Sequence, residues 1–139
     1  MKEKIFHLSP REKGQFKKNL VEILQACEGI EFSYLYGSFT EDLPFHDVDV
    51  GVYLAEIEES ETTRQAINLA QMLSTRLKMP IDVRILNFAP VSFLYHVIRG
   101  DLIAAKNDML HSRVVERTVQ KYLDLKPIIL KTIKEAFAT

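Results

Sequence analysis

The sequence lacks several features that mark particular classes of protein. It contains a single cysteine, Cys27, so no disulfide can form within the chain, as is usual in a reducing compartment. No apolar run is long enough to cross a bilayer, and the stretch before Ser9 lacks the apolar core of a secretory signal. We therefore expect a cytoplasmic protein that is not bound to a membrane.

The chain also lacks an excess of positive charge. Its 18 Lys and Arg residues are balanced by 19 Asp and Glu, which gives a net charge of −1 and argues against strong nucleic-acid binding. Repeats, low-complexity tracts and Gly/Ser linkers are absent as well. With 139 residues, 47% hydrophobic and 27% charged, the sequence predicts one globular domain over residues 1–139.

Helical and strand patterns alternate along the chain. Ser9 to Glu12 is a capping box with proline at the first helical position, and it predicts a helix that ends before Gly29. Periodicity predicts further helices at about 60–78 and 89–99, and strands at 30–36, 48–54, 81–86 and, at an edge, 101–106. A last helical region from 108 onward is expected to kink at Pro127.

This order of elements predicts an α/β or α+β fold: a small mixed sheet with helices on one face, followed by C-terminal helices. Residues 1–86 would form a catalytic core, and residues 87–139 a mainly helical C-terminal part.

Three carboxylates are predicted to share one face of this sheet. Asp47 and Asp49 are two residues apart at the second strand, so both project from the same side. Asp82 has the same phase on the third strand and joins them if the two strands pair. Neighbouring carboxylates repel each other unless a cation lies between them, and the preceding turn at Gly37 and Ser38 could hold phosphates that the cation bridges. The pattern indicates metal-dependent phosphoryl or nucleotidyl transfer.

Other side chains near this motif have two interpretations each. Arg84, on the predicted face of Asp82, either neutralises pyrophosphate or forms an ion pair with Asp82. Ser38 is a helix cap, a phosphate ligand or both. His46 is either a group that supports the site or an exposed loop histidine, and Tyr53 either packs on the sheet or approaches a nucleotide base.

A Gly-Ser turn, an Asp-x-Asp pair on the next strand and one Asp on a later strand resemble the DNA polymerase beta-type nucleotidyltransferase superfamily. Within it, the chain resembles the minimal nucleotidyltransferase (MNT) domains over nearly its whole length. The resemblance implies that Gly37 and Ser38 contact a nucleoside triphosphate and that Asp47, Asp49 and Asp82 form a site for two Mg²⁺ ions. Asp82 would also accept the proton of the acceptor hydroxyl.

Many MNT proteins resemble antitoxins of HEPN-type ribonuclease toxins, and some transfer AMP from ATP to a tyrosine of the toxin. The resemblance thus implies a protein adenylyltransferase with a HEPN toxin as partner. Two alternatives stay open: an antitoxin that acts only by forming a complex, and an enzyme for small hydroxylated substrates. Because there is no second substrate domain, the partner or a second copy of the chain in a homo-oligomer must complete the cleft.

The loop between the Gly-Ser turn and the first carboxylate departs from the family pattern. The family often has a small residue, Arg and Gly after the turn, and Ser before the first Asp, whereas this chain has His46 there and Glu41 and Asp42 in the loop. Two extra acids near the path of the phosphates disfavour a triphosphate unless they point away. Pro44 should also shorten any helix that starts at Ser38.

Overall fold

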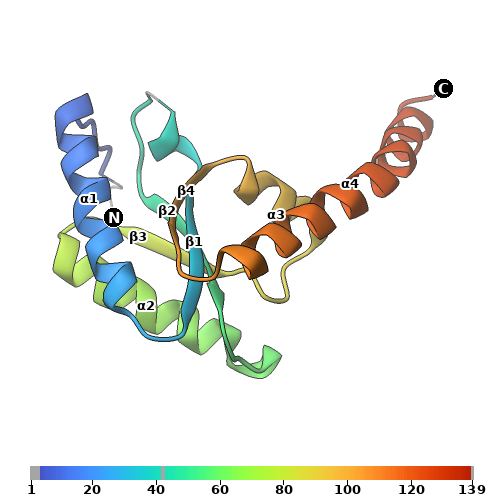
Figure 1. Ribbon diagram of the computed structural model, residues 1–139. Helices are drawn as coiled ribbons and strands as arrows, with labels where there is room; N and C mark the ends of the chain where they lie inside the picture. Colours follow the sequence, from blue (N-terminus) through green and yellow to red (C-terminus); the bar gives the residue numbers. More distant parts are fainter. Residues whose placement is uncertain (1–3, 42, 139) are drawn as a thin grey trace.

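The computed structural model describes residues 4–41 and 43–138. Its elements, shown in Figure 1, are α1 (Pro10–Ala26), β1 (Ile30–Tyr36), the 3₁₀ turn η1 (Ser38–Thr40), β2 (Val48–Leu54), the 3₁₀ turn η2 (Glu59–Glu61), α2 (Thr62–Leu77), β3 (Ile81–Ile85), α3 (Val91–Ile98), β4 (Asp101–Ala105) and α4 (Asp108–Ala136). The predicted strands and helices are therefore confirmed, with small shifts at their ends. Within the described ranges, none of the helices combines the length and apolar character that a membrane span requires.

The four strands form one mixed sheet in the order β3-β2-β1-β4. β1 is antiparallel to both β2 and β4, whereas β2 and β3 are parallel because α2 carries the chain back between them. The predicted mixed sheet is confirmed. β4 lies at one edge of the sheet, so the segment after residue 86 contributes a strand as well as helices.

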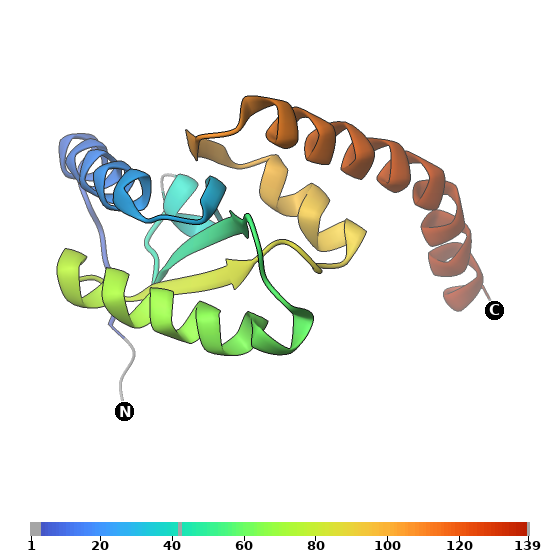
Figure 2. The same ribbon diagram turned by 60° about the horizontal axis from the view of Figure 1, so that its bottom comes forward.

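One face of the sheet is covered by α1 and α2 (Figure 2). Val48, Val50 and Val52 of β2 point to this side and are fully buried. The capping box is present as predicted: the Ser9 side chain accepts a hydrogen bond from the Glu12 N–H, and the Glu12 carboxylate accepts one from the Ser9 N–H. α1 thus begins where the sequence indicates and lays its apolar side on the sheet.

The opposite face is partly covered too, which corrects the expectation of helices on one face only. α3 and α4 pack over Phe32, Tyr34 and Tyr36 of β1, three aromatic side chains that would otherwise be exposed to water. The rings of Tyr95 and Tyr122 stack with their centroids 3.7 Å apart and hold α3 against α4. β1 is therefore buried on both of its faces.

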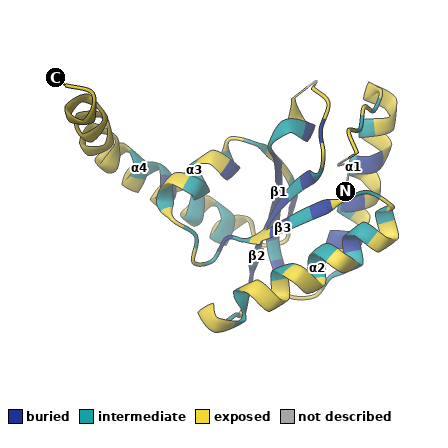
Figure 3. Cartoon of the chain, turned by 180° about the vertical axis from the view of Figure 1, so that it is seen from behind, coloured by how far each residue is buried: buried dark blue, intermediate teal, exposed yellow. Residues whose placement is uncertain are grey.

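α4 is 29 residues long and leaves the body of the protein along its second half. The helix continues through Pro127 and bends in this region, in agreement with the predicted kink (Figure 2). Every residue from Leu123 to Ala138 is exposed, including large apolar side chains, as the burial colours in Figure 3 show.

Candidate active site

The pairing of β2 with β3 brings two of the predicted carboxylates side by side. Asp49 and Asp82 are direct neighbours in the parallel register and so project from the same face of the sheet. Asp47 precedes β2 by one residue, and all three side chains are half-buried. The strand pairing on which the prediction for Asp82 depends is therefore present, and it places Asp82 beside Asp49.

The electrostatics of this face reflect burial first and the nearness of like charges second. Burial, followed by the negative charges of Asp47 and Asp82, raises the pKa of Asp49 to about 6, whereas Arg84 opposes the shift. Burial and the nearby Asp49 also raise the pKa of Tyr36, which pairs with Asp49 across the two strands. Ionisation of Asp49 in the folded protein is therefore opposed by burial and by its acidic neighbours.

Gly37 ends β1 directly against the Asp49 carboxylate. Its φ of 80° lies in the left-handed region that favours glycine, and a Cβ atom there would lie 2.2 Å from Asp49 Oδ2. The turn that follows is short: η1 spans three residues, and the Thr40 hydroxyl donates to the Gly37 carbonyl at 2.7 Å. Gly37 occupies the cap position of this turn, so the interpretation of Ser38 as a helix cap is wrong.

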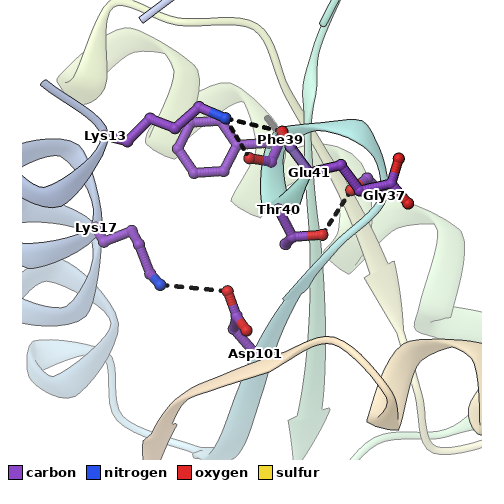
Figure 4. Close-up of polar contacts among 7 residues, drawn as sticks. All are labelled: Lys13, Lys17, Gly37, Phe39, Thr40, Glu41 and Asp101. Atoms are coloured by element: carbon purple, nitrogen blue, oxygen red, sulfur yellow. Dashed lines mark hydrogen bonds and ion pairs between the residues drawn. The ribbon is translucent and has the colours of Figure 1, made fainter. Parts of the chain in front are cut away.

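A lysine from α1 holds this loop in place (Figure 4). Lys13 Nζ donates to the carbonyl oxygen of Phe39 at 2.8 Å and to that of Glu41 at 3.0 Å. The sequence gives no local sign of this contact, because Lys13 lies 26 residues before Phe39, and we did not predict it. Glu41 is exposed, and Asp42, the other acid of this loop, lies outside the described residues.

The side chains with two interpretations are resolved in part. Arg84 Nε lies 3.4 Å from Asp82 Oδ2, in an ion pair in which both side chains remain substantially exposed. His46 is exposed, and its Nδ1 forms a hydrogen bond of 3.1 Å with the Lys4 carbonyl. Tyr53 stacks on Phe32 with ring centroids 4.9 Å apart, which favours packing on the sheet.

The carboxylates fit a magnesium site that substrate phosphates complete. Among the described residues, no group of three or more His, Cys, Asp and Glu side chains is already drawn together as a metal site. Mg²⁺, however, usually takes only one or two protein carboxylates and fills its remaining positions with water and phosphate oxygens. Asp49 and Asp82 supply that number of neighbouring oxygen ligands, and the raised pKa of Asp49 indicates a charge that a cation would offset.

Comparison with known sequences identifies the family. The sequence model of the polymerase beta nucleotidyltransferase family matches residues 18–109. The chain belongs to this family. The matched range contains the glycine turn and all three carboxylates, whereas most of α4 lies beyond it. No curated protein matches the sequence.

Solved structures share the fold of this nucleotidyltransferase at low sequence identity. The MNT antitoxin complex with the tri-AMPylated HEPN toxin of Shewanella oneidensis contains a chain with a TM-score of 0.70 and 18% identity. The match covers 91% of this chain and 99% of that one. A chain of the MntA-HepT toxin-antitoxin complex has a TM-score of 0.69 and 17% identity, over 90% and 99% of the two chains. A chain of a toxin-antitoxin complex with AMP-PNP has a TM-score of 0.70 and 19% sequence identity. The match covers 88% of this chain and 98% of that one.

Proposed function

We propose that this protein is an Mg²⁺-dependent nucleotidyltransferase that neutralises a HEPN-type ribonuclease toxin in the cytoplasm by transferring AMP from ATP to a toxin tyrosine. The observation that carries the proposal is the alignment of Asp49 with Asp82 on one face of the sheet, beside Gly37. The family membership and the fold shared with toxin-antitoxin complexes, one of them holding AMP-PNP, support it.

Each part of the site has a role in this proposal. The backbone of the turn at Gly37 and Ser38 holds the triphosphate, and Arg84 neutralises the pyrophosphate end. Asp47, Asp49 and Asp82 hold Mg²⁺, with two ions expected in the complete site. Bound Mg²⁺ orients the phosphates and offsets the charge that develops during transfer.

The proposed reaction balances with ATP and the tyrosine hydroxyl alone. The hydroxyl oxygen forms a bond to the α-phosphorus of ATP, and the bond between that phosphorus and the oxygen bridging to the β-phosphorus breaks. Pyrophosphate leaves, and the hydroxyl proton passes to the Asp82 carboxylate. The toxin then carries AMP in an ester bond to its tyrosine.

The second half of α4 supplies a surface for the toxin. Apolar side chains gather on one side of it, where Ile133 is 49% and Phe137 83% exposed. Helices that expose such a stripe usually bury it against a partner. The matched chains of known structure come from complexes with HEPN toxins, which favours the toxin over a second copy of this chain as that partner.

Incubation of the purified protein with ATP, MgCl₂ and its cognate HEPN toxin tests the enzymatic proposal. We expect the toxin to gain one or more adenylyl groups in intact-mass spectra and to lose ribonuclease activity. The same mixture with Asp49→Asn should leave the toxin mass unchanged. An unmodified toxin after prolonged incubation with the wild-type protein, at saturating ATP, would overturn the proposal.

A second candidate, neutralisation by complex formation alone, is favoured by the exposed apolar side of α4. Two variants separate it from catalysis in cells that express the toxin. If binding alone suffices, Asp49→Asn protects the cells and Ile133→Asp does not; if transfer is required, Asp49→Asn fails to protect. Lys131→Glu, on the opposite side of the helix, is the control for a charge change and should behave like the wild type.

A further inference from the structure

Two lysines project from one side of α1 and contact different parts of the protein (Figure 4). Lys13 and Lys17 are four residues apart, about one helical turn, and both are partly buried. Lys17 Nζ lies 3.2 Å from the Asp101 carboxylate of β4 in an ion pair. Lys13 Nζ instead donates to two backbone carbonyls, those of Phe39 and Glu41. Of these two lysines, Lys13 is therefore the one that joins α1 to the loop after Gly37.

Aromatic rings of the core fix the position of the Lys13 ammonium group. Its Nζ lies 5.0 Å from the centroid of the Phe39 ring and 5.8 Å from that of the Phe45 ring. Both rings are buried, and they contact each other edge to face with centroids 5.0 Å apart. The core thus sets where the ammonium group lies, and the carbonyls that it binds are held with it.

The loop itself has no cationic side chain that could take this place. Residues 38–46 contain neither lysine nor arginine, whereas Glu41 and Asp42 are acidic. Carbonyl oxygens carry partial negative charge and repel phosphate oxygens. A turn whose backbone binds a triphosphate must therefore direct N–H groups toward it and carbonyls away from it. The bonds to Lys13 direct the carbonyls of Phe39 and Glu41 toward α1.

We propose that Lys13 is a positioning residue for the nucleotide, which holds the turn after Gly37 in the conformation that binds the triphosphate. This inference rests on the proposed transferase function, in which the backbone of this turn holds the triphosphate. The turn is also tied to the acidic face, because Gly37 lies directly against the Asp49 carboxylate. The N–H and the hydroxyl of Thr40 both donate to the Gly37 carbonyl, at 3.1 and 2.7 Å. Lys13 thus fixes the far end of a turn whose near end contacts the site.

Loss of Lys13 should weaken nucleotide binding more than it slows the chemical step. The proposed metal ligands Asp47, Asp49 and Asp82 lie on or next to β2 and β3, and none of them depends on the loop for its place in the sheet. Part of the binding free energy of the nucleotide must instead order the turn when Lys13 is absent. The expected signature is a higher KM for ATP at a nearly unchanged kcat.

Lys13→Met tests this, because methionine keeps much of the apolar stem but removes the charge and the donors. Lys17→Met is the matched control, since it removes the same charge one turn away. In calorimetric titrations with AMP-PNP and MgCl₂, the Kd should rise about fivefold or more in Lys13→Met and less than about twofold in Lys17→Met. With ATP and the cognate HEPN toxin, the KM for ATP should rise by a similar factor while kcat stays within about threefold. Lys13→Arg, which keeps a charge and N–H donors, should restore most of the affinity.

Amide hydrogen exchange without nucleotide reports on the turn itself. The N–H groups of Thr40 and Glu41, which donate to the Gly37 and Ser38 carbonyls, should exchange faster in Lys13→Met than in the wild type or Lys17→Met. Wild-type affinity for AMP-PNP in Lys13→Met, equal weakening in Lys17→Met, or weakened binding with unchanged exchange would overturn the inference and leave the function intact. Binding that depends on Lys13 as described, without any transfer to the toxin by the wild type, would instead contradict the function and keep the role of Lys13.

Discussion

The two faces of the central sheet are built from the same strands but differ in burial and in charge. One is apolar and covered by helices, and the other carries half-buried carboxylates. On β2, the side chains of Val48, Val50 and Val52 are fully buried beneath α1 and α2. Asp49 projects from the other side of the same strand. There α3 and α4 cover β1 but not β3, and the carboxylate side chains are half-buried. A shift of one residue along the strand thus separates a fully buried valine from a half-buried carboxylate that the proposed function assigns to the active site.

This difference explains how the fold tolerates crowded carboxylates. The buried face removes apolar surface from water and stabilises the sheet, so the acidic face need not contribute to stability. Burial of Asp49 and the negative charges beside it instead oppose its ionisation in the folded state. We expect substitutions on the buried face to lower the stability of the fold, and substitutions on the acidic face to lower the rate of transfer. The predictions run from the largest expected effect to the smallest.

Asp49→Asn should break the acidic face while sparing the fold. Loss of this proposed Mg²⁺ ligand should lower the rate of adenylyl transfer by roughly 10³-fold or more, because a bound metal contributes several kcal/mol to transition-state stabilisation. The transfer assay with ATP and toxin measures this. Asp101→Asn, which removes an exposed acid that pairs with Lys17 at 3.2 Å, is the matched control and should keep near-normal rates.

Val52→Ala should break the buried face and leave the chemistry intact. The cavity in a fully buried position should lower the free energy of unfolding by about 2–3 kcal/mol, which urea denaturation measures. The folded fraction should transfer AMP within about twofold of the wild type. If fully folded Val52→Ala transferred AMP much more slowly than the wild type, the buried face would also affect the geometry of the acidic face.

Gly37→Ala should damage the site where the glycine turn contacts it. The added Cβ would lie 2.2 Å from Asp49 Oδ2, so the carboxylate must move, and we expect a loss of transfer of about tenfold or more. Gly29→Ala is a matched control, since Gly29 has a similar φ of 85° but a Cβ added there would meet nothing within 4 Å. Both variants should lose about 1 kcal/mol of stability to backbone strain, and only the first should lose activity.

The pKa of Asp49 predicts how pH acts on the acidic face. Because this pKa is raised from 3.8 to about 6, the folded state holds a proton that the unfolded chain releases, and stability should fall as pH rises from about 4 to about 6. At pH 7.5, MgCl₂ should therefore raise the Tm of the wild type but not that of Asp49→Asn. The rate of transfer at limiting Mg²⁺ should decline below about pH 6. A difference in Tm between the wild type and Asp49→Asn that does not change with pH would contradict the raised pKa of Asp49.

Arg84→Gln should give the smallest effect on stability. Its ion pair with Asp82 spans 3.4 Å between side chains that are 63% and 43% exposed, and such exposed pairs contribute about 0–1 kcal/mol. If Arg84 contacts pyrophosphate, however, the KM for ATP should rise several-fold in the same variant. An unchanged KM would leave Arg84 with the role of an ion-pair partner only.

Most of the site could be predicted from the sequence because it follows from local periodicity. The alternation of apolar and acidic residues indicated the faces of β2 and β3, and only their pairing was left to assume. The cover over β1 was not predicted, because the pattern of residues 30–36 indicates a strand but does not show which helices pack over Phe32 and Tyr34. Lys13 was missed because its contacts with the loop join segments far apart in the chain.

The turn after Gly37 shows another limit of prediction from the sequence. The sequence allows Ser38 to be a helix cap, a phosphate ligand or both, and the structure has a single 3₁₀ turn with Gly37 at the cap position. Which residue of a Gly-Ser pair caps a helix depends on backbone angles that neither side chain reveals. The position of the turn was predictable, and its internal geometry was not.

The exposed half of α4 has a consequence for the kinetics of neutralisation. At a rise of about 1.5 Å per residue, the second half of this 29-residue helix extends about 20 Å. In the proposed function, a toxin docked along this half of α4 would stay attached while its acceptor segment moves in and out of the site. Transfer within such a complex is a first-order event whose rate does not depend on how dilute the two proteins are. The proposal therefore predicts that the extent of modification per toxin molecule depends on the lifetime of the complex and not on the concentration of the free proteins.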